Sequence, residues 1–230
     1  ELLGKTLVIA PPHLLDIENQ GSWENAFINF GFRKRDYKCQ SIGMLDEIIK
    51  NNEHKKFDTV LIDEAHRFRT EETEMYTKLA QICRGKKVIL VSATPYNNST
   101  KDLLSQIKLF QSTRKSNIPN LTDLDGFFNS LNNKLKGLDR HTDKHEYLKI
   151  SKENAKIIRE RVLKYLMVRR TRKEIEQYYG EDLKTQGMKF PEVVNPTPVF
   201  YEFNSEESQI FSSTVTMITE KFKYSRYTPF

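Results

Sequence analysis

Residues 57–66, FDTVLIDEAH, join a short apolar run to two adjacent carboxylates and a histidine. The run Phe57–Ile62 has the length of a buried β-strand. Asp63 and Glu64 follow it directly, which places them at the carboxyl end of that strand. Open α/β sheets bind their ligands at this end. The stretch therefore predicts both a buried strand and a functional site where the strand stops.

Three more apolar runs, at residues 6–10, 37–42 and 87–91, have the same character. Stretches with helical spacing separate the runs, and each is expected to turn one apolar face inward. The expected inward residues are Trp23, Phe27 and Phe30; Leu45, Ile48 and Ile49; and Met75, Leu79 and Ile82. Buried strands that alternate with helices indicate a parallel sheet covered on both faces. The predicted fold class is α/β.

The pattern changes after residue 100. A helix is expected over 102–110, and the polar stretch 111–150 contains one amphipathic segment at 127–135. A long helix is predicted over 151–173, with Ile158, Val162, Tyr165 and Leu166 inward. Val199–Phe203 alternates like a strand, and Ser205 is a suitable start for a last helix. The predicted domains are a first part (1–110), a helical insertion with a basic helix (111–175), and a linker with the start of a second lobe (176–230).

The composition, with 37% hydrophobic and 30% charged residues and only 9 Gly and 8 Pro, is that of a soluble globular protein. It excludes collagen-like, disulfide-scaffold and glycine-linker classes. No apolar run reaches the roughly 18 residues of a membrane helix, and the N-terminal residues lack signal-peptide features. Cys39 and Cys83 lie far apart and are expected to be reduced. These features predict a cytoplasmic, intracellular protein without a membrane partner.

Positive charge is mildly in excess, with 37 Lys and Arg against 31 Asp and Glu and a net charge of +6. Such a balance permits a polyanionic partner without requiring one. The predicted helix 151–173 concentrates nine Lys or Arg against two Glu. Arg169, Arg170 and Arg172 could contact nucleic-acid phosphates, or the charges could be a solvated helix face with a structural role.

A second polar quartet, Ser92-Ala93-Thr94-Pro95, follows the apolar run 87–91 as the acidic quartet follows Phe57–Ile62. Hydroxyl groups at a strand end can form hydrogen bonds with a neighbouring carboxylate or imidazole. A single quartet of this kind is only a turn. The two quartets together are more informative, because they occur in the order strand, acidic quartet, helix, strand, hydroxyl quartet.

These segments resemble superfamily-two helicases. DEAH at 63–66 is similar to their motif II, SATP at 92–95 to motif III, and LVIAPPHLL at 7–15 to motif Ia. Trp23, TPYNN at 94–98, LMVRRT at 166–171 and KFP at 189–191 resemble the Swi/Snf-related branch. The resemblance covers roughly residues 5–110 and 160–205. It implies the first RecA-like lobe of a phosphate-loop ATPase.

The resemblance also implies roles and cofactors, namely ATP and Mg²⁺. Asp63 would coordinate Mg²⁺ through water, and Glu64 would be the general base or water-orienting group. His66 would connect the state of the nucleotide to Ser92 and Thr94. Pro11, Pro12 and His13 would lie where the lobe touches the nucleic-acid backbone.

Gly4-Lys5-Thr6 has the letters of a phosphate loop but runs straight into a strand, whereas a phosphate loop precedes a helix. The true loop is expected upstream of Glu1, and the arginine motif in a second RecA-like lobe of the same protein. The 230 residues alone are therefore expected to be inactive as an ATPase.

The parent protein is expected to be a DNA-dependent translocase on double-stranded DNA. Two alternatives are a helicase subunit of a restriction system and a non-catalytic RecA-like module that binds nucleic acid or protein.

Overall fold

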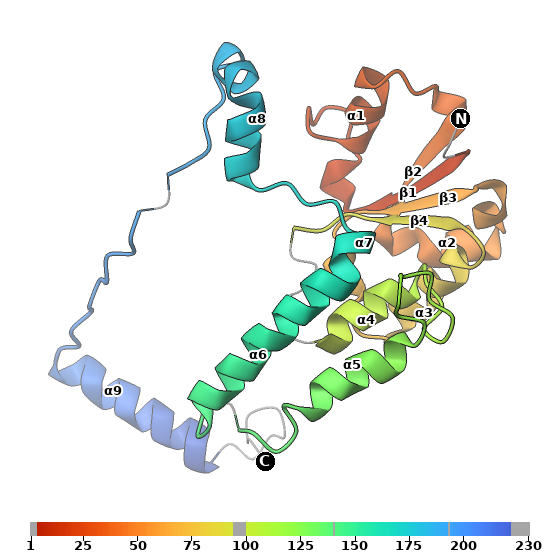
Figure 1. Cartoon of the computed structure of the whole chain (residues 1–230). Coiled ribbons are helices and arrows are strands. Elements are labelled where there is room, and N and C mark those ends of the chain that lie inside the picture. Colours follow the sequence, from red (N-terminus) through yellow and green to blue (C-terminus); the bar gives the residue numbers. More distant parts are fainter. Residues whose placement is uncertain (1–3, 94–99, 140, 193, 222–230) are drawn as a thin grey trace. The chain divides into compact units, whose positions relative to one another are not determined.

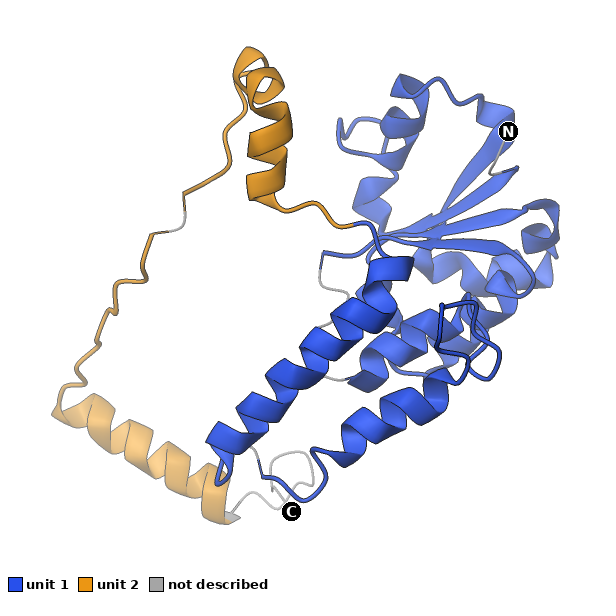
Figure 2. Cartoon of the chain, in the orientation of Figure 1, with its two compact units in different colours: residues 1–168 blue, residues 169–230 orange. Residues whose placement is uncertain are grey.

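A computed structural model of the chain describes residues 4–93, 100–139, 141–192 and 194–221. The chain forms two compact units, one of residues 1–168 and one of residues 169–230 (Figure 2). Both cysteines are free thiols, as expected. None of the helices in the described part of the chain has the length and hydropathy of a membrane span.

A four-stranded sheet organises the first unit. Its strands are β1 (Thr6–Ala10), β2 (Tyr37–Ser41), β3 (Thr59–Ile62) and β4 (Lys87–Leu90), in the order β2-β1-β3-β4. All three pairings are parallel. Every residue of β1 and β3 is buried, as a central parallel strand with both faces covered requires. The predicted α/β class and all four predicted strands are confirmed.

Helices cover the sheet on both faces (Figure 1). Val8 and Ala10 of β1 pack with Phe27 of α1 (Trp23–Asn29) on one face. The alternate residues of β1 pack on the other face with α2 (Leu45–Lys50) and α3 (Glu74–Cys83). The period of two along the strand thus sends neighbouring residues into separate cores.

Two of the residues predicted to point inward in the helices that cover the sheet are exposed. Phe30 is 81% exposed because α1 ends at Asn29 and Phe30 only caps it. Met75 is 44% exposed because Tyr76, one turn before Leu79, takes the inward place in the first turn of α3. For Phe30 the cause is the end of the helix, which periodicity does not give. For Met75 the cause is the choice between two neighbouring residues that both have helical spacing to Leu79.

The rest of the first unit is helical. α4 (Thr100–Lys108), α5 (Leu124–Asn133) and α6 (Lys144–Ile158) pack around a second core. After α6 the chain continues as a π-helical turn, Arg159–Leu163, and as α7 (Lys164–Leu166). The predicted amphipathic segment at 127–135 corresponds to α5, whose Phe128 and Leu131 are buried.

The predicted helix over 151–173 is wrong at both ends. Helical structure begins at Lys144 and stops at Leu166, and Met167 is extended with φ −125° and ψ 133°. Ile158 and Val162 are inward as predicted, but Tyr165 is 51% exposed. A new helix, α8 (Arg172–Thr185), starts behind a capping box in which Thr171 and Glu174 bond each other's backbone. A Thr-x-x-Glu sequence signals a helix start, and here it divides the predicted helix.

The second unit contains α8, α9 (Ser205–Thr216) and a π-helical turn, Met217–Lys221. The last helix begins at Ser205 as predicted, with Asn204 as its cap. The predicted strand Val199–Phe203 is wrong, because within the described residues this segment pairs with no other strand. A strand needs a partner for its backbone N–H and C=O groups, and alternation of side chains does not supply one.

Candidate functional site

The candidate site lies at the carboxyl edge of the sheet, where β1, β3 and β4 end. Asp63 N–H donates to the carbonyl of Ile9 at 2.9 Å, which ties the end of β3 to β1. Val91 N–H donates to Ile62 at 2.8 Å, and Ala65 N–H donates back to Val91 at 3.0 Å. The turn that contains Asp63–His66 is therefore held by both neighbouring strands.

Glu64 makes the turn sharp. Its backbone is left-handed, with φ 52° and ψ 43°, a conformation that costs a non-glycine residue about 1 kcal/mol. Its N–H donates to Asp63 Oδ1 at 2.7 Å, and a 3₁₀ turn, Ala65–Phe68, follows with both terminal residues buried. The strain persists because the turn is anchored on both sides, and it keeps Asp63 and Glu64 together at the sheet edge.

A chain of three polar side chains joins the ends of β3 and β4. His66 Nδ1 lies 2.9 Å from Glu64 Oε2 and 3.5 Å from Ser92 Oγ. The Glu64 and His66 side chains are about one-third exposed, so solvent and a ligand can reach them. The structure thus brings together the predicted residues Glu64, His66 and Ser92. Thr94 lies outside the described residues.

Asp63 has a partner that sequence reasoning missed. Trp23 Nε1 donates to Asp63 Oδ2 at 2.7 Å, across 40 residues of sequence. The sequence placed Trp23 on the apolar face of a helix and among the residues that resemble the Swi/Snf-related branch, but gave it no partner. The available signal was the indole N–H, which needs an acceptor when the ring is partly buried.

Pro11, Pro12 and His13 lie at the same edge, directly after β1. Pro11 is buried and precedes a 3₁₀ turn, Pro12–Leu14, in which Pro12 and His13 are exposed. The carbonyl of His13 accepts a hydrogen bond from Asn19 Nδ2 at 2.8 Å, which holds the loop. Of the three predicted contact residues, Pro12 and His13 therefore lie on an accessible turn after β1, whereas Pro11 is buried.

Arg169 and Arg170 belong to the second unit. Both are exposed and lie in the extended segment before α8, where Arg170 Nη1 donates to the carbonyl of Arg169 at 2.9 Å. The two arginines were predicted to lie on a basic helix, and this prediction is wrong. They lie in an extended segment, because α7 ends at Leu166.

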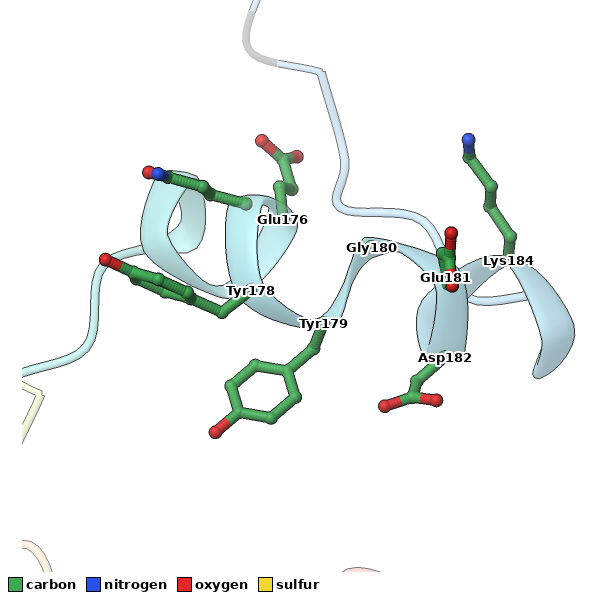
Figure 3. A pocket seen from close by; sticks show the side chains of 8 residues that line it. Glu176, Tyr178, Tyr179, Gly180, Glu181, Asp182 and Lys184 are labelled. Carbon is green, nitrogen blue, oxygen red and sulfur yellow. The ribbon is translucent and has the colours of Figure 1, made fainter.

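A hollow in the second unit is not a comparable site. It lies at the kink of α8, where Tyr179 has non-helical backbone angles, and eight residues of this one helix line it (Figure 3). Glu176 and Lys184 point to one side and Tyr179 and Asp182 to the other. The lining carries three carboxylates and one lysine, so it is unsuited to a nucleotide's phosphates.

The donor set at the sheet edge fits Mg²⁺. Carboxylate oxygen is the ligand that this ion prefers, and Mg²⁺ is commonly held by one or two carboxylates together with water and substrate phosphates. Asp63 and Glu64 supply such carboxylates on adjacent residues. Both Asp63 oxygens accept one hydrogen bond each, which leaves capacity for further donors or for water.

A parallel α/β sheet with an Asp-Glu-Ala-His turn at the end of a central strand defines a RecA-like lobe of a superfamily-two helicase. The SNF2-related domain family matches residues 5–211, and the chain belongs to that family. The family comprises ATP-dependent helicases and translocases that generally use ATP and Mg²⁺. The predicted Swi/Snf-related membership is thereby confirmed. No curated protein matches the chain.

Proposed function

We propose that the chain is part of an ATP-dependent translocase that moves along double-stranded DNA, with Asp63 and Glu64 as the catalytic carboxylates of that protein. The observation that carries this proposal is the contact chain from Glu64 through His66 to Ser92, beside Asp63. A catalytic carboxylate and a coupling imidazole lie together where two parallel strands end. Such an edge is where open α/β sheets bind nucleotides.

Each carboxylate has a separate task in the proposal. Asp63 would hold Mg²⁺ through water, and the ion would supply positive charge for the phosphates of the nucleotide. Glu64 engages His66 through Oε2. Its Oε1 would then orient the attacking water toward the γ-phosphate and accept a proton from that water.

His66 is the coupling residue. Its Nδ1 faces both Glu64 and Ser92, so a change at the Glu64 carboxylate alters which of them it engages. Ser92 lies two residues after the end of β4, and Thr94 is two residues further along the sequence. In the proposal, hydrolysis of the nucleotide bound near the end of β3 thereby alters the contacts of Ser92 after the end of β4.

Double-stranded DNA and a second RecA-like lobe are the proposed partners. Pro12 and His13 present an accessible turn at the sheet edge, and Arg169 and Arg170 present exposed charge in the second unit. Each arginine that neutralises a phosphate adds to the salt dependence of binding. Arg169→Gln with Arg170→Gln should lower this salt dependence.

The 230 residues alone should not hydrolyse ATP at a measurable rate. The cradle for the β- and γ-phosphates requires a Gly-rich loop that opens a helix, and Gly4-Lys5-Thr6 enters β1 instead. Turnover by the purified chain that Glu64→Gln abolishes would contradict this part of the proposal.

The test is ATP hydrolysis by the longest natural protein that contains these residues, with duplex DNA, with single-stranded DNA and without DNA. Duplex DNA should stimulate hydrolysis most, and Glu64→Gln should lower kcat by about 10²-fold or more. Glu72→Gln, at an exposed glutamate eight residues further on, is the matched control and should leave kcat unchanged. Hydrolysis that neither DNA stimulates would reject the translocase. Absence of hydrolysis under all three conditions would favour the alternative of a non-catalytic RecA-like module that binds nucleic acid or protein.

A further inference from the structure

The hydrogen bond from Trp23 to Asp63 joins two distant parts of the sequence at the candidate site. Trp23 is the first residue of α1, and Asp63 is the first residue after β3. The Nε1–Oδ2 distance of 2.7 Å is at the short end for an N–H donor and is typical of a bond to a charged acceptor. A partly buried N–H therefore meets the carboxylate proposed to hold Mg²⁺.

The position of the indole is determined by its surroundings. The Ser22 hydroxyl, fully buried, caps α1 by accepting from Asn25 N–H at 3.3 Å and so fixes where the helix begins. The Trp23 ring packs against Phe27 with centroids 5.9 Å apart, and Phe27 stacks on Tyr37 of β2 at 4.6 Å. An aromatic column that rests on the sheet thus holds the indole N–H toward Asp63.

Both oxygens of the Asp63 carboxylate accept hydrogen bonds. Oδ1 accepts from the backbone N–H of Glu64 at 2.7 Å, and Oδ2 accepts from Trp23 at 2.7 Å. Two donors on two oxygens fix the rotation of the carboxylate plane, whereas one donor would leave it free to turn. An indole N–H is a donor only, so Trp23 can orient the carboxylate without competing for a cation.

We propose that Trp23 is a positioning residue that holds the Asp63 carboxylate in the orientation that receives hydrated Mg²⁺ with the nucleotide. This inference rests on the proposed function, because it assigns Trp23 to the same site. Partners that orient a metal-binding carboxylate commonly change metal affinity by about 10-fold or more when they are lost. The role belongs to the N–H group, and the packing of the ring is a separate, structural contribution.

The hydrogen bond itself is tested in the 230-residue chain by its indole N–H signal in a ¹H–¹⁵N NMR spectrum. The chain contains one tryptophan, so the assignment is unambiguous. Asp63→Asn, which removes the negative charge, and Asp63→Ala, which removes the acceptor, should both move the signal upfield. Glu72→Gln should leave it in place. A signal that keeps its position in both Asp63 variants would overturn the proposal.

The functional test measures the Mg²⁺ concentration that gives half-maximal ATP hydrolysis in the longest natural protein that contains these residues. Trp23→Phe keeps an aromatic ring and loses the donor, so the half-saturating Mg²⁺ concentration should rise by about 10-fold. Replacement of Trp23 by 3-benzothienylalanine, with sulfur in place of N–H, should have the same effect with the ring packing preserved. Replacement by 5-fluorotryptophan, which keeps N–H, should restore the original value.

Tyr76→Phe is the control for a merely structural effect. The Tyr76 hydroxyl donates to the carbonyl of Ser105 at 2.8 Å, so this variant also loses one hydrogen bond and keeps its ring. It should lower stability without changing the dependence on Mg²⁺. An unchanged Mg²⁺ dependence in both Trp23 variants that lack N–H, with hydrolysis still abolished by Glu64→Gln, would reject the role of Trp23 alone. Hydrolysis that survives Glu64→Gln would instead reject the proposed function.

Discussion

The two units of the chain have helices of similar length that are stabilised in different ways. In the first unit, α3, α4 and α5 each bury several apolar side chains against a strand or another helix. In the second unit, α8 and α9 bury none, and each begins with a complete capping box. Helices of the first unit are therefore stabilised by tertiary packing, and those of the second by local hydrogen bonds. Packing contributes several kcal/mol per large side chain, whereas a cap contributes about 1 kcal/mol.

The largest difference between the two units is expected when a phenylalanine is truncated to alanine and the loss of free energy of unfolding is measured. Phe128 of α5 is fully buried, so Phe128→Ala should lower the free energy of unfolding by about 3–5 kcal/mol. Phe211 of α9 is 54% exposed and stacks on Phe203 with centroids 5.1 Å apart, so Phe211→Ala should lower it by about 1 kcal/mol or less. Urea unfolding followed by circular dichroism measures both, with the exposed Phe30→Ala as a control from the first unit. Equal losses for Phe128 and Phe211 would contradict the comparison.

Alkaline pH should destabilise the first unit through a buried thiol. Burial raises the pKa of Cys83 to about 12, from an ordinary value of 9. The unfolded chain releases this proton first, so the contribution is fully present below pH 9 and is lost as the pH rises towards 12. Each unit of pKa difference corresponds to about 1.4 kcal/mol. The loss of stability is measured as the difference between the urea midpoints at pH 8 and pH 10.5, and it should be smaller in Cys83→Ala. An identical loss in Cys83→Ala would show that the Cys83 thiol is not its cause.

Loss of a helix cap should have different consequences in the two units. Asn204 accepts from Glu207 N–H at 2.9 Å, and Asn204→Ala should destabilise α9 by about 1 kcal/mol, or roughly fivefold in amide exchange. With no buried side chain to retain it, α9 should lose protection along its whole length. Ser22→Ala removes the corresponding cap from α1, whose Phe27 is buried, so exchange should increase only in the first turn. Hydrogen exchange by NMR distinguishes these patterns, and an α9 that loses protection only in its first turn would refute the contrast.

Acid should act on the second unit, with the smallest effect because the carboxylates involved are exposed. The Tyr201 hydroxyl and Asn204 N–H donate to Glu207 and hold its pKa below the usual 4.5, and Thr171 does the same for Glu174. A lowered pKa means that the stabilisation is present above pH 4.5 and is lost as the pH falls through the folded-state value. The helical Cα chemical shifts of α9 should decrease between pH 6 and pH 3. Glu207→Gln, which does not titrate, should show no such change; a wild-type decrease in this variant would rule out Glu207.

Sequence reasoning predicted the sheet better than the helical part. Strands β1 and β3 are continuous apolar runs buried on both faces, and such runs indicate a strand wherever it is placed. The extent of α6 and the break at Met167 were not predicted, because the pattern after residue 150 remains amphipathic across the break. The Thr171–Glu174 capping box was a readable local signal that a new helix begins there.

The failed strand at Val199–Phe203 has a different cause. Val199, Tyr201 and Phe203 alternate with the period of a strand. A strand, however, forms only when a second segment pairs with its backbone through hydrogen bonds. Within the described residues the segment has no partner, and its side chains remain largely exposed. No local pattern can provide the second segment.

The sequence alone determined the α/β class, the four strands, the family and the two quartets that mark the site, because these depend on the order of residues along short segments. The tertiary structure decided what the site residues contact. Trp23 reaches Asp63, and His66 lies between Glu64 and Ser92, because parallel strands bring their carboxyl ends to one edge. Those contacts join residues 26 and 40 positions apart, and only the register of the sheet and the packing of α1 on it determine such distances.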